Sequence, residues 1–99
     1  MTKNDKVALI TGAAKRIGKQ TAIELHQAGY NVIIHYNSSL APAQALVDQL
    51  NELRSNSAKL LQADITDIEQ VKSLGEQAPK LFGRLDVLVN NASSFYPTP

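Results

Sequence analysis

The sequence predicts an α/β fold in which a parallel sheet is covered by helices on both faces. Near-continuous apolar runs, rather than strict alternation, are typical of strands that are buried on both faces. Such runs recur about every 25 residues, at Val7–Ile10, Val32–His35, Leu60–Ala63 and Leu85–Val89. Helical patterns fill the intervals, and strands that alternate with helices form parallel sheets through right-handed crossovers.

Three amphipathic patterns, at residues 17–28, 43–53 and 68–81, predict the helices. Gly29 stands where the first helix needs a left-handed C-cap, and Pro42 suits the first turn of the second. Thr66–Glu69 has the pattern of a capping box for the third helix. We expect Pro79 to kink or end that helix locally and Gly83 to stop it. The order is therefore β-α-β-α-β-α-β, with an expected strand order of 3-2-1-4.

Composition narrows the class of protein. The 99 residues suit one small domain, and a net charge of +1 points to neither nucleic acid nor an acidic membrane surface. The absence of cysteine excludes disulfides and thiolate chemistry, and two histidines are too few to indicate a metal site. The polar first residues are not followed by the apolar region of a secretory signal peptide. No apolar stretch approaches the ~20 residues that a transmembrane helix needs. We therefore expect a cytoplasmic protein without a metal.

The segment Thr11–Gly18 follows the first strand and begins the first helix. A glycine pattern in that position is typical of dinucleotide-binding turns. Gly12 allows a sharp turn, and Gly18 allows the helix to approach the strand closely. The positive helix start then faces a pyrophosphate. The predicted cofactor contacts are Gly12, Lys15, Arg16, Ile17 and Gly18. This segment indicates a Rossmann-type doubly wound fold; the alternative is an ordinary turn with a capping glycine.

The end of the second strand predicts which dinucleotide binds. A protein that binds NAD places an acid here for the ribose 2′-hydroxyl, but no acid occurs between Asn31 and Asp48. The residues present, all predicted cofactor contacts, are His35, Tyr36, Asn37, Ser38 and Ser39. Because the last three can donate to a 2′-phosphate with Arg16 nearby, we expect NADPH. The serines can also cap the next helix. His35 is expected to line the cofactor without transferring protons, and the alternative is a structural hydrogen bond.

Polar residues also follow the third and fourth strands. Asp64 can accept from the adenine amino group while Ile65 packs on the ring, or Asp64 can stabilise the start of the third helix. The segment Asn90–Ser93 lies where ligands bind in such sheets, and Asn91, Ala92 and Ser93 are predicted cofactor contacts. Phe95 can stack on an aromatic ring or cover the sheet edge.

The fourth strand would be an apolar sheet edge, which natural proteins protect. Either another part of a longer protein covers that strand or a separate partner does. We expect residues 1–99 to be the dinucleotide-binding part of one domain in a chain of about 250 residues.

These residues together resemble the short-chain dehydrogenase/reductase superfamily, whose usual patterns are TGxxxGxG and NNAG. Arg16 stands in place of the middle glycine, and Ser93 in place of the last. Those two departures, with His35-Tyr36 and the segment 91–97, resemble the pteridine reductases, and the resemblance covers essentially the whole chain.

The resemblance implies an NADPH-dependent reductase of biopterin, dihydrobiopterin and also dihydrofolate. The pterin would lie between the nicotinamide and Phe95, and the implied substrate-binding residues are Arg16, Ser93 and Phe95. Relatives often carry an arginine after the tyrosine that matches Tyr36, where this chain has Asn37-Ser38-Ser39. A homotetramer is expected of the full-length protein.

The superfamily's catalytic Tyr-x-x-x-Lys is absent from these residues. Tyr30 and Tyr36 are followed four positions later by Ile34 and Leu40, and Tyr96 is three residues from the end. We therefore expect no catalytic residue in this chain and no activity from it alone. The alternatives are a short-chain reductase of another carbonyl or imine, and a non-catalytic dinucleotide-binding module.

Overall fold

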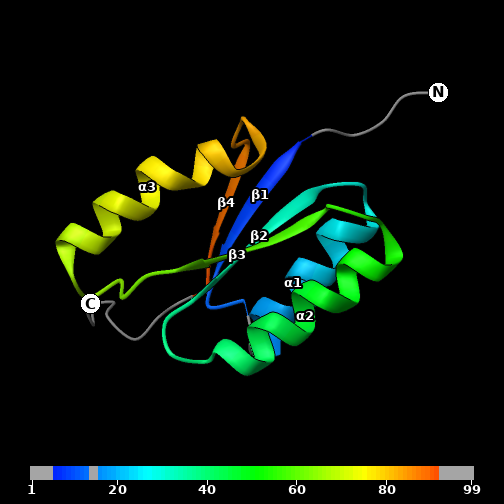
Figure 1. Cartoon of the computed structure of the whole chain (residues 1–99), viewed down its shortest axis with the longest axis horizontal. Coiled ribbons are helices and arrows are strands. Elements are labelled where there is room, and N and C mark those ends of the chain that lie inside the picture. Colours follow the sequence, from blue (N-terminus) through cyan, green and yellow to red (C-terminus); the bar gives the residue numbers. More distant parts are fainter. Residues whose placement is uncertain (1–5, 14–15, 92–99) are drawn as a thin grey trace.

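The computed structural model describes residues 6–13 and 16–91, which form a four-stranded parallel sheet and three helices (Figure 1). In chain order the elements are β1 (Val7–Thr11), α1 (Arg16–Gln27), β2 (Asn31–Tyr36), α2 (Leu40–Leu53), β3 (Ala58–Gln62), α3 (Ile68–Phe82) and β4 (Val87–Asn90). The sheet has the order β3-β2-β1-β4 with every pairing parallel. The predicted fold class and strand order are confirmed.

Two apolar layers hold the helices to the sheet. On one face, Ala8 and Ile10 of β1 pack with the buried side chains of α1 and α2. On the other face, Val7 and Leu9 pack with Leu74 of α3. The two groups of helices lie on opposite sides of the sheet in Figure 1. Because alternate residues of β1 face different helices, every position is buried, which explains the continuous apolar run.

Several predicted boundaries were wrong. β3 begins at Ala58 rather than Leu60, and β4 begins at Val87 rather than Leu85. The N-cap of α3 is Asp67, which accepts from the Glu69 amide, whereas the Thr66 hydroxyl donates to Asp64. The helix also continues through Pro79 to Phe82.

The predicted glycine stops are confirmed. Gly83 ends α3 with φ of +87°, and Gly29 follows α1 with φ of +104°. Both lie in the left-handed region, where a helix end favours glycine. These two residues turn the chain back toward the sheet at the amino ends of the next strands.

β4 is an edge of the sheet within the part of the chain that the structure describes. Leu88 is 62% exposed, whereas its register partner Leu9 is buried. Leu9 packs on the face that α3 covers, so Leu88, its register partner, lies on that same face at the sheet edge. None of the helices among the described residues has the length and apolar character needed to cross a bilayer.

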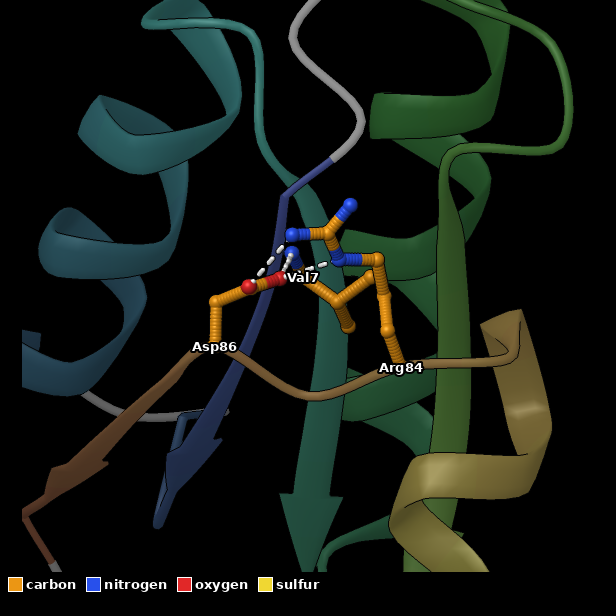
Figure 2. A network of polar contacts seen from close by, with 3 residues as sticks. All are labelled: Val7, Arg84 and Asp86. Carbon is orange, nitrogen blue, oxygen red and sulfur yellow. Dashed lines mark hydrogen bonds and ion pairs between the residues drawn. The ribbon is translucent and has the colours of Figure 1, made fainter.

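A polar network joins the amino ends of β1 and β4 (Figure 2). The Asp86 carboxylate accepts from the Val7 amide at 2.8 Å and from Arg84 Nε and Nη2 at 2.9 and 2.7 Å. The Asp86 amide in turn donates to the Val7 carbonyl at 2.9 Å. The bonds from Arg84 and Val7 lower the pKa of Asp86. This network aligns two strands that are far apart in the sequence.

We predict that Asp86→Ala lowers the urea midpoint of unfolding more than Arg84→Ala does. The first change leaves the amide of the buried Val7 without its acceptor, and a buried unpaired donor is costly. The second removes a surface ion pair with Asp86, and exposed ion pairs contribute little to stability. Equilibrium unfolding followed by circular dichroism measures both midpoints. A larger loss for Arg84→Ala would contradict this account of the network.

Candidate cofactor-binding site

The start of α1 packs directly on the turn that follows β1. Gly12 makes the turn with φ of +61°. A Cβ atom on Gly18 would collide with the Gly12 carbonyl oxygen and would lie 3.0 Å from Ala13 Cα. The close approach expected at Gly18 is therefore present. Lys15 lies outside the described residues.

Two backbone amides of this turn donate to β2 rather than face outward. The Gly12 amide donates to His35 Nδ1 at 3.0 Å, and the Ala13 amide donates to the His35 carbonyl at 3.2 Å. The amides left for an anion are those of the first turn of α1, which have no intrahelical acceptor. That turn contains no acid, so no carboxylate neutralises the positive helix end.

Arg16 and Ile17 are exposed at the beginning of α1. Ile17 is 74% exposed, although its position in the sequence placed it on the apolar stripe of the helix. Arg16 has φ of +39°, a left-handed conformation that costs a non-glycine residue about 1–2 kcal/mol. Position 16 is where the usual superfamily pattern has glycine, the residue that adopts a positive φ at the lowest cost.

The segment after β2 presents polar groups at the same edge of the sheet. Asn37 and Ser38 are exposed, and the Asn37 carbonyl accepts from Gln62 Nε2 at 2.9 Å. Ser39 occupies the N-cap position of α2, but its side chain makes no capping hydrogen bond. The capping alternative therefore does not account for the Ser39 hydroxyl. Tyr36 is half-buried, and its carbonyl accepts from the Ala63 amide.

His35 is buried at the carboxyl end of β2. Nε2 lies 2.8 Å from the Ala63 carbonyl, and Nδ1 accepts from the Gly12 amide. Burial lowers the pKa of His35, although the bond to Ala63 opposes the shift. The ring is therefore neutral near pH 7. Its contacts support the structural alternative for His35, and cofactor lining by this residue stays a prediction.

The end of β4 is joined to the end of β1. The Thr11 hydroxyl lies 2.9 Å from Asn90 Oδ1, and the Asn91 amide donates to Thr11 Oγ1 at 2.9 Å. Asn91 Nδ2 is buried and has no hydrogen-bond partner among the described residues. A buried amide donor without an acceptor is unusual and indicates a missing partner. The predicted contacts at Ala92, Ser93 and Phe95 lie outside the described residues.

Asp64 shapes the turn between β3 and α3. Its Oδ1 accepts from the Thr66 amide at 3.0 Å and from the Thr66 hydroxyl at 2.6 Å, and these bonds lower the pKa of Asp64. The Asp64 amide donates to Gln70 of α3 at 2.8 Å. These contacts support the alternative that Asp64 stabilises the entry to α3. Contacts of Asp64 and of the half-buried Ile65 with adenine stay predictions.

The predicted site residues that the structure describes follow the carboxyl ends of the strands or begin α1. The strand order runs outward from β1 to β2 and β3, and then the chain crosses through α3 to β4 on the other side of β1, so the direction of winding reverses between β1 and β4. This reversal is where open α/β sheets bind their ligands. The described residues contain no cluster of His, Asp and Glu suited to a metal ion. The fold and this edge together define an α/β protein of the Rossmann type.

The family follows from comparison with known proteins. The model of the short chain dehydrogenase family matches residues 6–98. The chain is 44% identical to Pteridine reductase 1 of Leishmania tarentolae over 94% of this chain and 38% of that protein. It is 46% identical to the Hydroxynaphthalene reductase-like protein Arp2 of Metarhizium acridum, over 90% of this chain and 33% of that protein.

A third relative is the 3-oxoacyl-[acyl-carrier-protein] reductase FabG of Staphylococcus aureus, which is 39% identical over 91% of this chain and 36% of that protein. The chain therefore belongs to the short-chain dehydrogenase family. It spans about a third of the length of the curated relatives that it matches.

Sequence reasoning missed three contacts that support this edge. Thr11 was taken as the start of the glycine-rich segment, yet its hydroxyl connects β1 to β4. Gln62 holds the segment after β2 through Asn37, and His35 holds the turn after β1. In the sequence, the contacts of Thr11 and Gln62 were indicated only by the position of these residues at strand ends. The contact between His35 and Gly12 had no local signal.

We predict that Gly18→Ala destabilises the protein by about 1–3 kcal/mol because the new methyl group meets rigid backbone. Gly75→Ala is the matched control, since Gly75 lies inside α3 with no atom within 4 Å of its added Cβ. That change should stabilise the helix by about 0.5–1 kcal/mol. Urea unfolding of both variants checks the pair. A Gly18→Ala protein as stable as the wild type would refute the close packing of α1 on the turn.

Proposed function

We propose that this protein is the dinucleotide-binding part of an NADPH-dependent reductase of pterins, with biopterin, dihydrobiopterin and dihydrofolate as substrates. The observation that carries the proposal is the 44% identity to Pteridine reductase 1 over 94% of the chain. Arg16 and Ser93, which resemble that group where the superfamily has glycine, support it. The full-length protein would be cytoplasmic, about 250 residues long and a homotetramer.

The described residues fit a dinucleotide. The unpaired Asn91 Nδ2 offers a buried donor, and the acid-free first turn of α1 offers amides and a positive helix end. Gly12, Lys15, Arg16, Ile17 and Gly18 would hold the pyrophosphate, Asp64 and Ile65 the adenine, and Asn91, Ala92 and Ser93 the nicotinamide half. The reduced nicotinamide supplies a hydride. The protein's part is to orient that ring against the substrate.

Selectivity for NADPH would come from the polar segment after β2. Asn37 and Ser38 are exposed, and the Ser39 hydroxyl makes no capping bond, so all three are available to a 2′-phosphate. Tyr36 would border the ribose, and the buried His35 would support the neighbouring turn. No carboxylate follows β2 to repel the phosphate, and Arg16 adds a positive charge at the start of α1. These features support NADPH over NADH.

For the pterin, we propose that Phe95 stacks on the substrate ring and that Arg16 and Ser93 contact it beside the cofactor. The catalytic Tyr-x-x-x-Lys pair does not occur in these 99 residues. We propose that it lies in the remainder of a longer chain, since the curated relatives extend well beyond the matched part. The 99-residue chain would then bind the cofactor without reducing a substrate.

A second candidate is a short-chain reductase of another carbonyl. The 46% identity to a hydroxynaphthalene reductase-like protein and the 39% identity to a 3-oxoacyl reductase favour it. The two candidates share the cofactor site and differ at the substrate, where Phe95 is the discriminating residue. A third candidate function is that of a non-catalytic dinucleotide-binding module.

We predict that this chain binds NADPH more tightly than NADH and that Arg16→Gly lowers NADPH affinity about tenfold or more by removing a charged contact. The advantage of NADPH should shrink at high salt, because phosphate recognition is electrostatic. Isothermal titration of both nucleotides at two salt concentrations measures this. Lys72→Ala, on exposed α3 surface, is the control and should bind like the wild type.

Arg16→Gly relieves a left-handed backbone, so its thermal stability should be unchanged or higher. A loss of affinity therefore cannot be ascribed to unfolding. Equal affinities for NADPH and NADH would contradict the proposed selectivity, and the absence of binding to either would contradict the cofactor site.

We predict that the full-length protein oxidises NADPH with biopterin and dihydrobiopterin, and that Phe95→Ala abolishes most of this turnover while leaving NADPH affinity intact. The reason is that stacking holds the pterin but not the cofactor. Absorbance at the NADPH band gives the rates, with a 3-oxoacyl thioester as the comparison substrate. Turnover of the thioester but not of the pterins would favour the second candidate, and turnover of neither would favour a binding module.

A further inference from the structure

We infer that His35 is a positioning residue for the cofactor site. Its neutral imidazole, with the proton on Nε2, holds the turn after β1 in the conformation that places the start of α1. The inference rests on the proposed dinucleotide binding. His35 does not need to touch the cofactor, because it acts through the backbone of Gly12 and Ala13.

One residue of β2 receives both amides of that turn. The Gly12 amide donates to His35 Nδ1 at 3.0 Å, and the Ala13 amide donates to the His35 carbonyl at 3.2 Å. The other ring nitrogen lies 2.8 Å from the Ala63 carbonyl, just past the end of β3. His35 therefore joins the ends of three strands at the edge where the ligand is proposed to bind.

The partners fix the protonation of the ring. A backbone amide can only donate, so Nδ1 must present its lone pair to Gly12. A carbonyl oxygen can only accept, so Nε2 must carry the proton that bonds Ala63. The side chain is 2% exposed, and water therefore has little access to replace either partner. Only the neutral Nε2–H form satisfies both contacts.

The position of Gly12 then sets the position of α1. The Gly12 carbonyl is the atom that a Cβ on Gly18 would meet first, so the helix rests on the peptide that His35 holds. That contact also sets the position of the first-turn amides of α1, which have no acceptor within the helix. Moving Gly12 would displace these donors from a bound pyrophosphate even if the sheet and helix stayed intact.

Substitution of His35 by asparagine or by glutamine tests the contacts of the two ring nitrogens separately. In His35→Asn the Oδ1 atom takes the place of Nδ1, so the acceptor for Gly12 remains and the donor to Ala63 is lost. In His35→Gln the Nε2 atom takes the place of the ring Nε2, so the donor to Ala63 remains and the acceptor for Gly12 is lost. Both residues are polar amides, so each variant is the control for the other.

The test measures NADPH affinity of the wild type and both variants by isothermal titration. We expect His35→Asn to stay within about threefold of the wild type and His35→Gln to bind about tenfold more weakly, the loss of about one hydrogen bond. Equal binding by His35→Gln and the wild type would overturn the inference. So would an equal loss in both variants, which would mean general damage to the core.

A measurement without cofactor keeps the inference testable if a variant fails to fold. In ¹⁵N-labelled wild-type protein, we expect a scalar coupling across the hydrogen bond from the Gly12 amide to His35 Nδ1, together with imidazole shifts of the Nε2–H tautomer. A proton on Nδ1 or the absence of the coupling would overturn the inference. If the wild type shows both signals but binds no NADPH, the proposed function fails while the role of His35 in holding the turn stands.

Discussion

The first turn of α1 rests on the backbone of the turn after β1, with no side chain between Gly18 and the Gly12 carbonyl. This contact brings a helix start to the carboxyl end of the central strand β1. Because β2 and β4 pair with either side of β1, the same contact places the helix amides between the segments that follow those strands. The cofactor edge is thus a consequence of one close approach that only glycine allows at position 18.

The two ends of the sheet use polar groups differently. At the amino end, Arg54 donates to the carbonyls of His26 and Tyr30, and buried Ser57 lies 2.7 Å from His26 Nε2. Asp86 likewise receives the Val7 amide. At the carboxyl edge, Asn91 Nδ2 is buried and has no hydrogen-bond partner among the described residues. Buried polar groups are normally matched within a fold, so this unmatched donor distinguishes the carboxyl edge from the amino end.

The sequence was enough to predict the order of elements, the sheet topology and the edge at which the polar residues meet, because each depends on apolar periodicity and on crossover handedness. It was not enough to predict where strands begin. β3 starts early because Asn51 Oδ1, from α2, accepts from the amides of Ser57 and Ala58. The contact between His35 and Gly12 escaped prediction for the same reason, since the two residues are 23 positions apart in the sequence. Contacts between a side chain and distant backbone leave no periodic signal.

Arg16 combines an unfavourable backbone conformation with an exposed positive charge at the start of α1. Its φ of +39° is unfavourable for any residue but glycine, by about 1–2 kcal/mol. Its exposed side chain makes no ion pair or hydrogen bond to the other described residues that would offset this cost. A residue held in a strained backbone conformation lowers the stability of the protein alone. Under the proposed function a bound pyrophosphate would offset this cost, because the helix amides and the Arg16 charge would both interact with it at the start of α1.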